Sequence, residues 1–231
     1  MNHLKNLNVL ISGGTAGLGR ALAAELVARG ARVAAFARHA EGVERLRGEL
    51  PGVHVFRGDV SRKDEIPAIA LRAIEALGGE VHVLVNNASA LGPVPLRPLL
   101  DTDCEDFEAA LQANLLGPFR LTKAVAGNML LHGGGLVVNV SSDAAVNAYP
   151  GWGAYSVTKA ALDHLTRLFN AEMKEANIQA VAVDPGDLRT ALHFAAVPQA
   201  DPATLKDPAR AARELADYLE RGDFSAERIR L

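Results

Sequence analysis

Three side chains that can take part in proton transfer stand at a characteristic spacing in the second half of the chain. Tyr155 and Lys159 are four residues apart in a stretch with a helical pattern, so both lie on one face of the predicted helix. Ser142 stands thirteen residues before Tyr155, at the end of a predicted strand. A tyrosine hydroxyl has a pKa of about 10, and an ammonium group beside it stabilises the phenolate and lowers that pKa. The three residues predict a general acid–base site, although the tyrosine–lysine pair alone also fits an ordinary exposed helix.

A glycine-rich segment follows the first predicted strand and opens the first predicted helix. The glycines of Ser12–Gly19 stand as Gly-x-x-x-Gly-x-Gly. Glycine lets the backbone approach a pyrophosphate closely, and the helix N-terminus offers unpaired N–H groups to the anion. The segment predicts a nucleotide-phosphate site, and a tight strand–helix loop is the alternative. The candidate cofactor contacts are Gly13, Thr15, Gly17, Leu18 and Gly19.

The end of the second predicted strand favours a phosphorylated ribose. A carboxylate usually follows this strand in sites that bind NAD, where it holds the ribose hydroxyls. This chain has Ala37 and then Arg38. A guanidinium pairs with a 2′-phosphate, which a carboxylate would repel, so the sequence favours NADP(H) over NAD(H). The alternatives are a solvated charge at Arg38 and a bystander at His39.

Polar residues also follow the third and fourth predicted strands, where open α/β sheets bind ligands. Asp59, followed by Val60, is a candidate acceptor for the adenine amino group, and a helix cap before Ser61–Asp64 is an equally good explanation. Asn86 and Ala88 belong to Asn-Asn-Ala-Ser and are further cofactor candidates, with an asparagine turn as the alternative.

Short apolar runs alternate with longer amphipathic stretches along the whole chain. The runs lack period-2 alternation, as strands buried on both faces do, and the order predicts βαβ units with a parallel sheet in one α/β domain. The predicted strands are Leu7–Ser12, Arg32–Ala37, Val53–Phe56, Val81–Asn86, Leu136–Ser141 and Ile178–Val183. The predicted helices are Gly17–Arg29, Gly42–Leu50, Asp64–Leu77, Asp103–Leu130 and Ala154–Ala176.

The composition narrows the class of protein further. The chain has 231 residues, 49% of them apolar, and a formal net charge of −3. This composition is too apolar for a disordered chain, and the mild acidity argues against nucleic acid as a partner. We expect neither a membrane span nor a signal peptide. The single cysteine, Cys104, excludes an internal disulfide and any multi-cysteine metal site, so we expect a cytoplasmic location and no metal.

Taken together, these residues resemble the short-chain dehydrogenase/reductase family over about Leu7 to Thr190. The resemblance rests on Gly13-x-x-x-Gly17-x-Gly19, Asn86-Asn87-Ala88, Asn114, Ser142, Tyr155-x-x-x-Lys159 and Pro185-Gly186. It implies a single-domain, doubly wound Rossmann-type fold over residues 1–231. It also implies hydride transfer between a nicotinamide and a small carbonyl or alcohol substrate.

The resemblance implies a role for each matched residue. Tyr155 is the general acid or base, and Ser142 hydrogen-bonds the substrate oxygen. Lys159 holds the nicotinamide ribose and lowers the tyrosine pKa, and Asn114 positions a water in the proton relay. The segment that holds the nicotinamide carboxamide comprises Pro185, Gly186, Leu188 and Thr190.

The chain also departs from the family pattern. Ser12 replaces the usual threonine, and Ser89 stands where glycine is usual, which narrows the space near the cofactor ribose. The region after Thr190 is short, so we expect a brief substrate-covering segment at about 191–207 and a reduced last strand within Ser225–Leu231. Trp152 and Phe194 fit the substrate pocket and the core equally well.

The sequence therefore favours an NADP-dependent oxidoreductase. The alternative is an NADP-sensing regulatory protein on the same fold; a sugar epimerase is disfavoured because few residues follow Thr190. The stretches Ala154–Ala176 and Asp103–Leu130 carry apolar residues on more than one stripe, which predicts a second buried face and a homodimer or homotetramer. Surface alanines in an alanine-rich chain are the alternative explanation.

Overall fold

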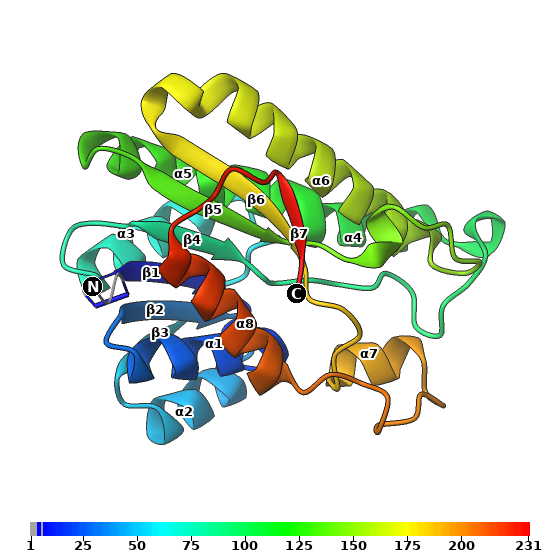
Figure 1. The fold of residues 1–231 in the computed structure, drawn as a ribbon. Helices are drawn as coiled ribbons and strands as arrows, with labels where there is room; N and C mark the ends of the chain where they lie inside the picture. Colours follow the sequence, from blue (N-terminus) through cyan, green and yellow to red (C-terminus); the bar gives the residue numbers. More distant parts are fainter. Residues whose placement is uncertain (1–3, 6) are drawn as a thin grey trace.

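The computed structural model describes residues 4–5 and 7–231, and there the chain folds around one parallel sheet (Figure 1). The strand order is β3-β2-β1-β4-β5-β6-β7. The strands are β1 Asn8–Ser12, β2 Arg32–Ala37, β3 Val53–Arg57, β4 Val83–Asn86, β5 Gly135–Val140, β6 Ile178–Asp184 and β7 Arg228–Arg230. The α-helices are α1 Gly17–Ala28, α2 Ala40–Glu49, α3 Ile66–Ala76, α4 Cys104–Leu111, α5 Gly117–Leu131, α6 Gly153–Met173, α7 Ala191–Ala196 and α8 Pro208–Arg221.

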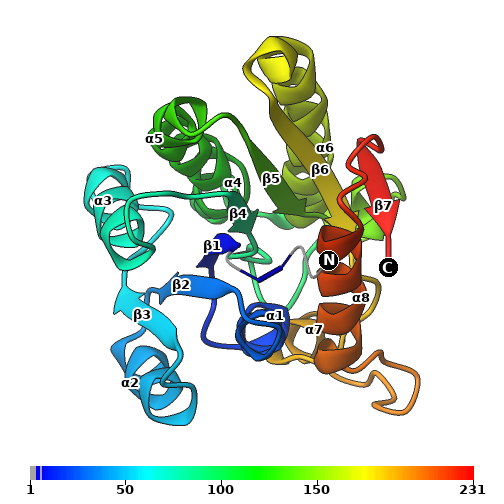
Figure 2. The ribbon, with the colours of Figure 1, turned by 60° about the vertical axis from the view of Figure 1, so that its left-hand side comes forward.

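Helices cover both faces of the sheet, as Figure 2 shows. One apolar core lies between the sheet and α1, α2 and α8, and includes Leu22 and Leu215. The other lies under α3 and α5 and includes Ile69 and Leu121. Because both faces are buried, the strands read as continuous apolar runs, and this confirms the predicted doubly wound α/β fold. Among the helices of residues 4–5 and 7–231, none is both long and apolar enough to cross a membrane.

The reversal of strand order between β1 and β4 determines where a ligand can bind. The chain runs outward from β1 to β3 and then returns to the other side of β1 to begin β4. The helices that leave the two neighbouring strands therefore diverge and open a crevice above the carboxyl ends of the strands. The glycine-rich turn, Asn87 and Ser142 all follow strands that end at this edge.

The predicted helix Asp103–Leu130 is divided in the structure. Residues Gln112–Leu116 form a π-helical turn between α4 and α5. Pro118 has no N–H to donate to the carbonyl of Asn114, four residues earlier, so regular α-helical bonding fails at this point. Single π-helical turns of this kind occur often at functional sites, and this one contains Asn114.

The region after Thr190 contains elements that the periodicity analysis did not assign. Helix α8 is capped by Asp207, whose Oδ1 accepts from the backbone N–H of Ala209 at 2.7 Å, and Pro208 occupies the first turn. Residues 191–207 comprise α7 and a loop. The expected last strand within Ser225–Leu231 is confirmed as β7, which pairs in parallel with β6 (Figure 1).

Candidate active site

A cleft of about 990 Å³ lies above the carboxyl ends of the strands. Its walls come from the glycine-rich turn, the ends of β2 to β6, α6 and the segment around α7. Most of the site residues proposed from the sequence line it: Gly13, Thr15, Gly17, Leu18, Arg38, Asp59, Val60, Ala88, Ser142, Tyr155, Lys159, Pro185, Gly186, Leu188 and Thr190.

The glycine-rich turn is packed so closely that three of its glycines, Gly13, Gly14 and Gly19, have no room for a side chain. Gly13 has φ +67°, and a Cβ there would lie 2.9 Å from Cα of Ala88. A Cβ on Gly19 would lie 2.4 Å from the carbonyl oxygen of Gly13. Gly13 lines the cleft, but Gly19 does not. Gly19 lets helix α1 approach the turn, and the cofactor contact expected at this residue stays a prediction.

The loop after β4 is tied to the glycine-rich turn by hydrogen bonds. The hydroxyl of Ser12 accepts from the backbone N–H groups of Asn87 and Ala88, at 3.0 and 3.1 Å. The side-chain amide of Asn87 donates to the carbonyl oxygens of Ser12 and Gly13. Serine thus supplies the hydroxyl that this junction needs. Asn87 was not among the site residues predicted from the sequence, although the Asn-Asn pair was its signal.

Asn86, which was expected to contact the cofactor, lies behind the cleft. Its side chain is almost fully buried and donates to Oδ1 of Asn139 at 2.8 Å. Asn139 in turn donates to the hydroxyl of Thr166 on α6. These bonds connect β4, β5 and α6 beneath the site. Asn86 is the last residue of β4 and its side chain lies in the core, whereas Asn87 begins the loop, so the cofactor contact expected at Asn86 stays a prediction.

The side chain of Asn114, which was also expected in the site, forms hydrogen bonds with other residues of the chain. Its Oδ1 accepts from the backbone N–H of Ala90 at 2.7 Å and from the Ser89 hydroxyl at 3.2 Å. Its Nδ2 donates to the Ala90 carbonyl and to the hydroxyl of Thr158 on α6. The side chain therefore positions the loop that lines the cleft. Because Pro118 has no N–H, the backbone carbonyl of Asn114 lacks its usual helical donor. This carbonyl, and not the side chain, is the atom of Asn114 that would contact a water.

Two arginines and a histidine line the end of the cleft beside β2 and β3. Arg38 and His39 line it together with Arg62, which the sequence analysis did not single out. Nε of Arg38 donates to Nε2 of His39 at 2.9 Å. Asp59 lines the same end, and its Oδ1 accepts from the backbone N–H and the hydroxyl of Ser61. Asp59 thus closes a local turn rather than capping a helix, because α3 begins only at Ile66 and its N-cap residue is Glu65.

Tyr155 is buried in the wall of the cleft and has Ser142 beside it. Burial raises the pKa of the Tyr155 hydroxyl to about 12, and the hydroxyls of Ser142 and Ser89 act in the opposite direction. The Ser142 hydroxyl donates to Oδ1 of Asp143 at 3.1 Å and accepts from the N–H of Ala144. Before any ligand binds, Tyr155 is thus held in its protonated form, as a proton donor must be.

Lys159 lies one helical turn after Tyr155 and is almost fully buried. Its Nζ donates to the carbonyl oxygen of Val140 at 2.7 Å and lies 5.4 Å from the centre of the Tyr155 ring. Burial lowers the pKa of Lys159 to about 8, and the negative charge of Asp163 opposes that shift. The ammonium is therefore close to its titration range, directly beside the tyrosine.

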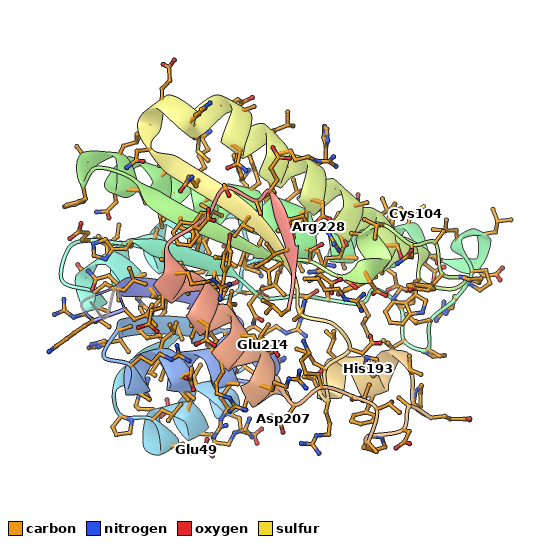
Figure 3. All side chains as sticks on the ribbon, in the orientation of Figure 1. Glu49, Cys104, His193, Asp207, Glu214 and Arg228 are labelled. Carbon is orange, nitrogen blue, oxygen red and sulfur yellow. The ribbon has the colours of Figure 1, made fainter. Side chains whose placement is uncertain are left out.

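Aromatic and acidic residues line the cleft beyond Tyr155. Trp152 packs edge-on against Tyr155, with ring centres 5.8 Å apart, and Tyr149 donates to Oδ2 of Asp143 at 2.7 Å. His193, which Figure 3 marks on α7, lines the opposite side. Of the two aromatic residues considered for the pocket, Trp152 lines the cleft and Phe194 does not.

Comparison with known proteins now decides the family. A family model described as short chain dehydrogenase matches residues 7–200. The chain belongs to the short-chain dehydrogenase family. This finding confirms the resemblance inferred from the motifs, and it makes the protein an oxidoreductase that transfers a hydride to or from a nicotinamide cofactor.

Curated members of the family show the range of activities that its relatives carry. An NADPH-dependent aldehyde reductase-like protein from Arabidopsis thaliana is 31% identical over 80% of this chain and 73% of its own length. Carbonyl reductase family member 4 from Danio rerio is 33% identical over 91% of this chain and 90% of its own.

A solved member of the family has nearly the same fold. The structure of a 7α-hydroxysteroid dehydrogenase complexed with NADH and 7-oxo glycochenodeoxycholic acid superposes with a TM-score of 0.88 at 26% identity. It covers 100% of this chain and 95% of that one.

The cleft fits a nicotinamide dinucleotide. Gly13, Gly17 and Leu18 line the cleft at the N-terminus of α1, where backbone N–H groups would stabilise a pyrophosphate. From there the cleft extends in one direction to Arg38 and in the other to Tyr155 and Gly186. The residues that would hold the cofactor thus form a continuous surface from its adenosine end to its nicotinamide end.

Proposed function

We propose that this short-chain dehydrogenase is an NADP(H)-dependent enzyme that interconverts a small carbonyl compound and its alcohol, with Tyr155 as the general acid or base. The observation that carries the proposal is the placement of Tyr155 in the cleft wall between Ser142 and the buried ammonium of Lys159. These groups supply a proton, a hydrogen-bond donor and a positive charge at one point, as carbonyl reduction requires.

Each side chain has a distinct task in the proposed reaction. When bound, the nicotinamide supplies the hydride to the carbonyl carbon. The Tyr155 hydroxyl transfers its proton to the carbonyl oxygen, while the Ser142 hydroxyl donates a hydrogen bond to that oxygen. Lys159 holds the nicotinamide ribose and stabilises the phenolate that remains on Tyr155. In the reverse direction, the phenolate removes the proton from the alcohol.

The arginines at the end of the cleft beside β2 and β3 support NADP(H) as the preferred cofactor. Ala37 stands where a ribose-binding carboxylate would favour NAD(H), and Arg38, His39 and Arg62 lie within reach of the same end of the cleft. A 2′-phosphate carries negative charge, which guanidinium groups bind in a bidentate manner. The NADPH-dependent name of the Arabidopsis thaliana relative agrees with this preference.

The opposite end of the cleft favours substrates without a negative charge. Asp143 and Asp187 line it, and Lys159 is the only lysine or arginine among the described residues that line this end. Trp152 and Leu91 supply apolar surface. A carboxylate or phosphate on the substrate would meet repulsion there, whereas a neutral aromatic or aliphatic carbonyl compound would be accepted. We propose that residues 191–207 cover this substrate.

Two further parts of the proposal concern the protein in its surroundings. We propose a cytoplasmic location, because a single exposed thiol suits a reducing compartment. We also propose assembly into a homodimer or homotetramer through α5 and α6. The sensor alternative is not favoured, because the named relatives are reductases and dehydrogenases and the acid–base groups are present.

The proposal is tested by following the absorbance of NADPH with a panel of neutral aldehydes and ketones. We expect turnover by the unmodified protein and loss of at least about a thousandfold in kcat for Tyr155→Phe, since the proton donor is removed. NADPH binding by this variant, measured by fluorescence titration, should stay within about threefold. Full activity of Tyr155→Phe would show that another group transfers the proton, and tight NADPH binding without turnover of any carbonyl would favour a sensor.

A further inference from the structure

Arg228, on the short strand β7, reaches across the sheet edge to the backbone of Ser142. Its Nη2 donates to the carbonyl oxygen of Ser142 at 3.0 Å, although the two residues are 86 positions apart in the chain. Figure 3 marks Arg228 on β7. The side chain is only 30% exposed. Arg228 also lies beyond the residues 7–200 that the family model matches.

The same guanidinium pairs with a carboxylate on the helix that carries Lys159. Nε of Arg228 donates to Oδ2 of Asp163 at 3.0 Å, and Asp163 is one helical turn after Lys159. The other oxygen of Asp163 accepts from the hydroxyl of Ser141. Asp163 is buried, so its charge needs these partners. Arg228 thus connects α6 to the end of β5.

A third contact extends the connection to the end of β6. Nη2 of Arg228 lies 3.4 Å from Oδ2 of Asp184, whose Oδ1 accepts from the backbone N–H of Gly186 at 3.0 Å. Gly186 lines the cleft at the nicotinamide end. One guanidinium therefore contacts three segments: the backbone of Ser142, the helix of Tyr155 and Lys159, and the end of β6 at Asp184. Asp184 in turn binds the backbone of Gly186.

The end of β5 is consequently fixed at three consecutive residues. Val140 accepts from Lys159, Ser141 donates to Asp163, and Ser142 accepts from Arg228. The planar guanidinium supplies several donors in fixed directions, whereas a lysine would supply a single mobile ammonium group. Small displacements of reacting groups cost large factors in rate, so the precision of these contacts bears on catalysis.

We propose that Arg228, together with Asp163, is a positioning residue that holds Ser142 and the Tyr155–Lys159 face of α6 in register for proton transfer. This proposal rests on the proposed function, because it assigns to Arg228 the alignment of groups that act in that reaction. Arg228 does not line the cleft, so it is placed to touch neither substrate nor cofactor. Its effect passes through the backbone of Ser142 and the carboxylate of Asp163.

The test compares Arg228→Ala with Arg230→Ala. Arg230 lies two residues later on the same face of β7 and is 69% exposed, and its ion pair is with Asp184, at 3.9 Å. Arg230→Ala therefore removes the same charge from β7 without removing a contact to Ser142 or Asp163. Trp152 is the only tryptophan of the chain and lines the cleft, so its emission during NADPH titration counts the intact sites in each preparation.

We expect kcat per NADPH-binding site to fall by about tenfold or more in Arg228→Ala and by less than about twofold in Arg230→Ala. The dissociation constant for NADPH should rise by less than about threefold in both, because loss of alignment affects the chemical step. Because kcat is expressed per binding site, unfolded protein does not contribute to the fall. Equal kcat in the two variants, or a fall confined to the number of binding sites, would overturn the proposal.

Chemical rescue of Arg228→Ala by a small guanidinium compound gives a result that a loss of folding would not produce. Ethylguanidinium at millimolar concentration should raise the kcat of Arg228→Ala by at least about fivefold and leave that of Tyr155→Phe unchanged. Arg228→Lys should remain at least about fivefold below the unmodified protein, because an ammonium cannot reach the three acceptors together. Full activity of Arg228→Lys would reduce the role of Arg228 to its charge and contradict the positioning argument.

A double-mutant cycle tests the pairing with Asp163. Arg228→Ala combined with Asp163→Asn should lower kcat no further than the more damaging single variant, since both changes break the same connection. Independent, multiplying effects would show that the two residues act separately. A failure of the proposed function is recognised differently, because the unmodified protein would then bind NADPH and turn over no carbonyl.

Discussion

At the scale of single residues, the site depends on two buried groups whose pKa values burial shifts in opposite directions. Burial keeps Tyr155 protonated and lowers the pKa of Lys159 to about 8, so that Lys159 is still an ammonium at neutral pH. Both shifts have the same cause, since burial disfavours the charged form of each group. The tyrosine can therefore serve as a proton donor over the whole physiological range, and the lysine decides where activity is lost.

This arrangement predicts the pH dependence of carbonyl reduction. Below a pH of about 8, Lys159 is an ammonium and Tyr155 is protonated, so the rate should be constant; as the pH rises through about 8, the ammonium is lost and the rate should fall. Asp163 is the charged group that acts on the pKa of Lys159, the ring of Tyr155 lies beside its ammonium, and Arg228 on β7 pairs with Asp163. A pH–rate profile with saturating NADPH measures the effect.

A variant of Asp163 tests the same prediction, because the carboxylate of Asp163 stabilises the ammonium form of Lys159. Asp163 raises the pKa of Lys159, so Asp163→Asn should move the fall in rate to lower pH. Glu172→Gln, an exposed change on the same helix, should leave its position unaltered. A rate that stays flat well above the pKa of Lys159 would show that this lysine does not control the reaction.

A second prediction at this scale concerns cofactor choice. NADPH should bind more tightly than NADH, by about tenfold or more, because a charge-assisted pair with Arg38 contributes about 1.5–3 kcal/mol. Arg38→Asp should reverse or abolish the preference, since a carboxylate repels the 2′-phosphate. Fluorescence titration with each cofactor gives the ratio. Equal affinities in the unmodified protein would refute the assignment of Arg38.

At the scale of elements, the contact between α1 and the glycine-rich turn determines the shape of the phosphate end. Gly19→Ala places a methyl group 2.4 Å from the Gly13 carbonyl oxygen and 2.5 Å from Nδ2 of Asn87. We expect a loss of about 1–3 kcal/mol in the free energy of unfolding, and weaker NADPH binding because the turn must move.

The matched control for this prediction is another helical glycine. Gly48 lies in α2, and a methyl group at this position would enter open space, so Gly48→Ala should stabilise the protein by about 0.5–1 kcal/mol through helix propensity. Urea unfolding of the two variants measures both effects. A stabilised Gly19→Ala protein with unaltered NADPH affinity would show that α1 does not need this close approach.

At the scale of the whole molecule, α5 and α6 leave apolar side chains exposed on the outside of the domain. Phe119, Val157 and Leu168 are 39%, 46% and 45% exposed, and the ring of Phe119 stacks on that of Phe169. The buried face of α6 includes polar residues such as Lys159. Part of the apolar stripe predicted from the sequence therefore faces away from the sheet. This exposed apolar surface supports an interface with a second copy of the chain.

We therefore expect light scattering at micromolar concentration to give two or four times the mass of one 24.4 kDa chain. Leu168→Glu should shift the mass towards a single chain, because a buried carboxylate at a symmetric interface is repelled by its copy. Leu71→Glu, a change of the same kind on α3 at a residue that is 58% exposed, should not. A single-chain mass for the unmodified protein, unchanged by NADPH, would contradict this expectation.

The sequence determined the features that depend on local spacing. Buried strands appeared as short apolar runs, and the i, i+4 spacing placed Tyr155 and Lys159 on one face of a helix. The motif order identified the family and the edge of the sheet where the cleft lies. These inferences succeed because helix and strand periodicity relates sequence position directly to the direction of a side chain.

Only the tertiary structure decided which neighbouring residue faces the cleft and which distant residues meet. It turned Asn86 into the core and left Asn87 in the loop, and it gave Gly19 a packing role. It also brought Arg228 to Ser142 across 86 positions of the chain. Such contacts depend on how strands and helices pack together, and packing depends on the whole chain, so no local spacing in the sequence encodes them.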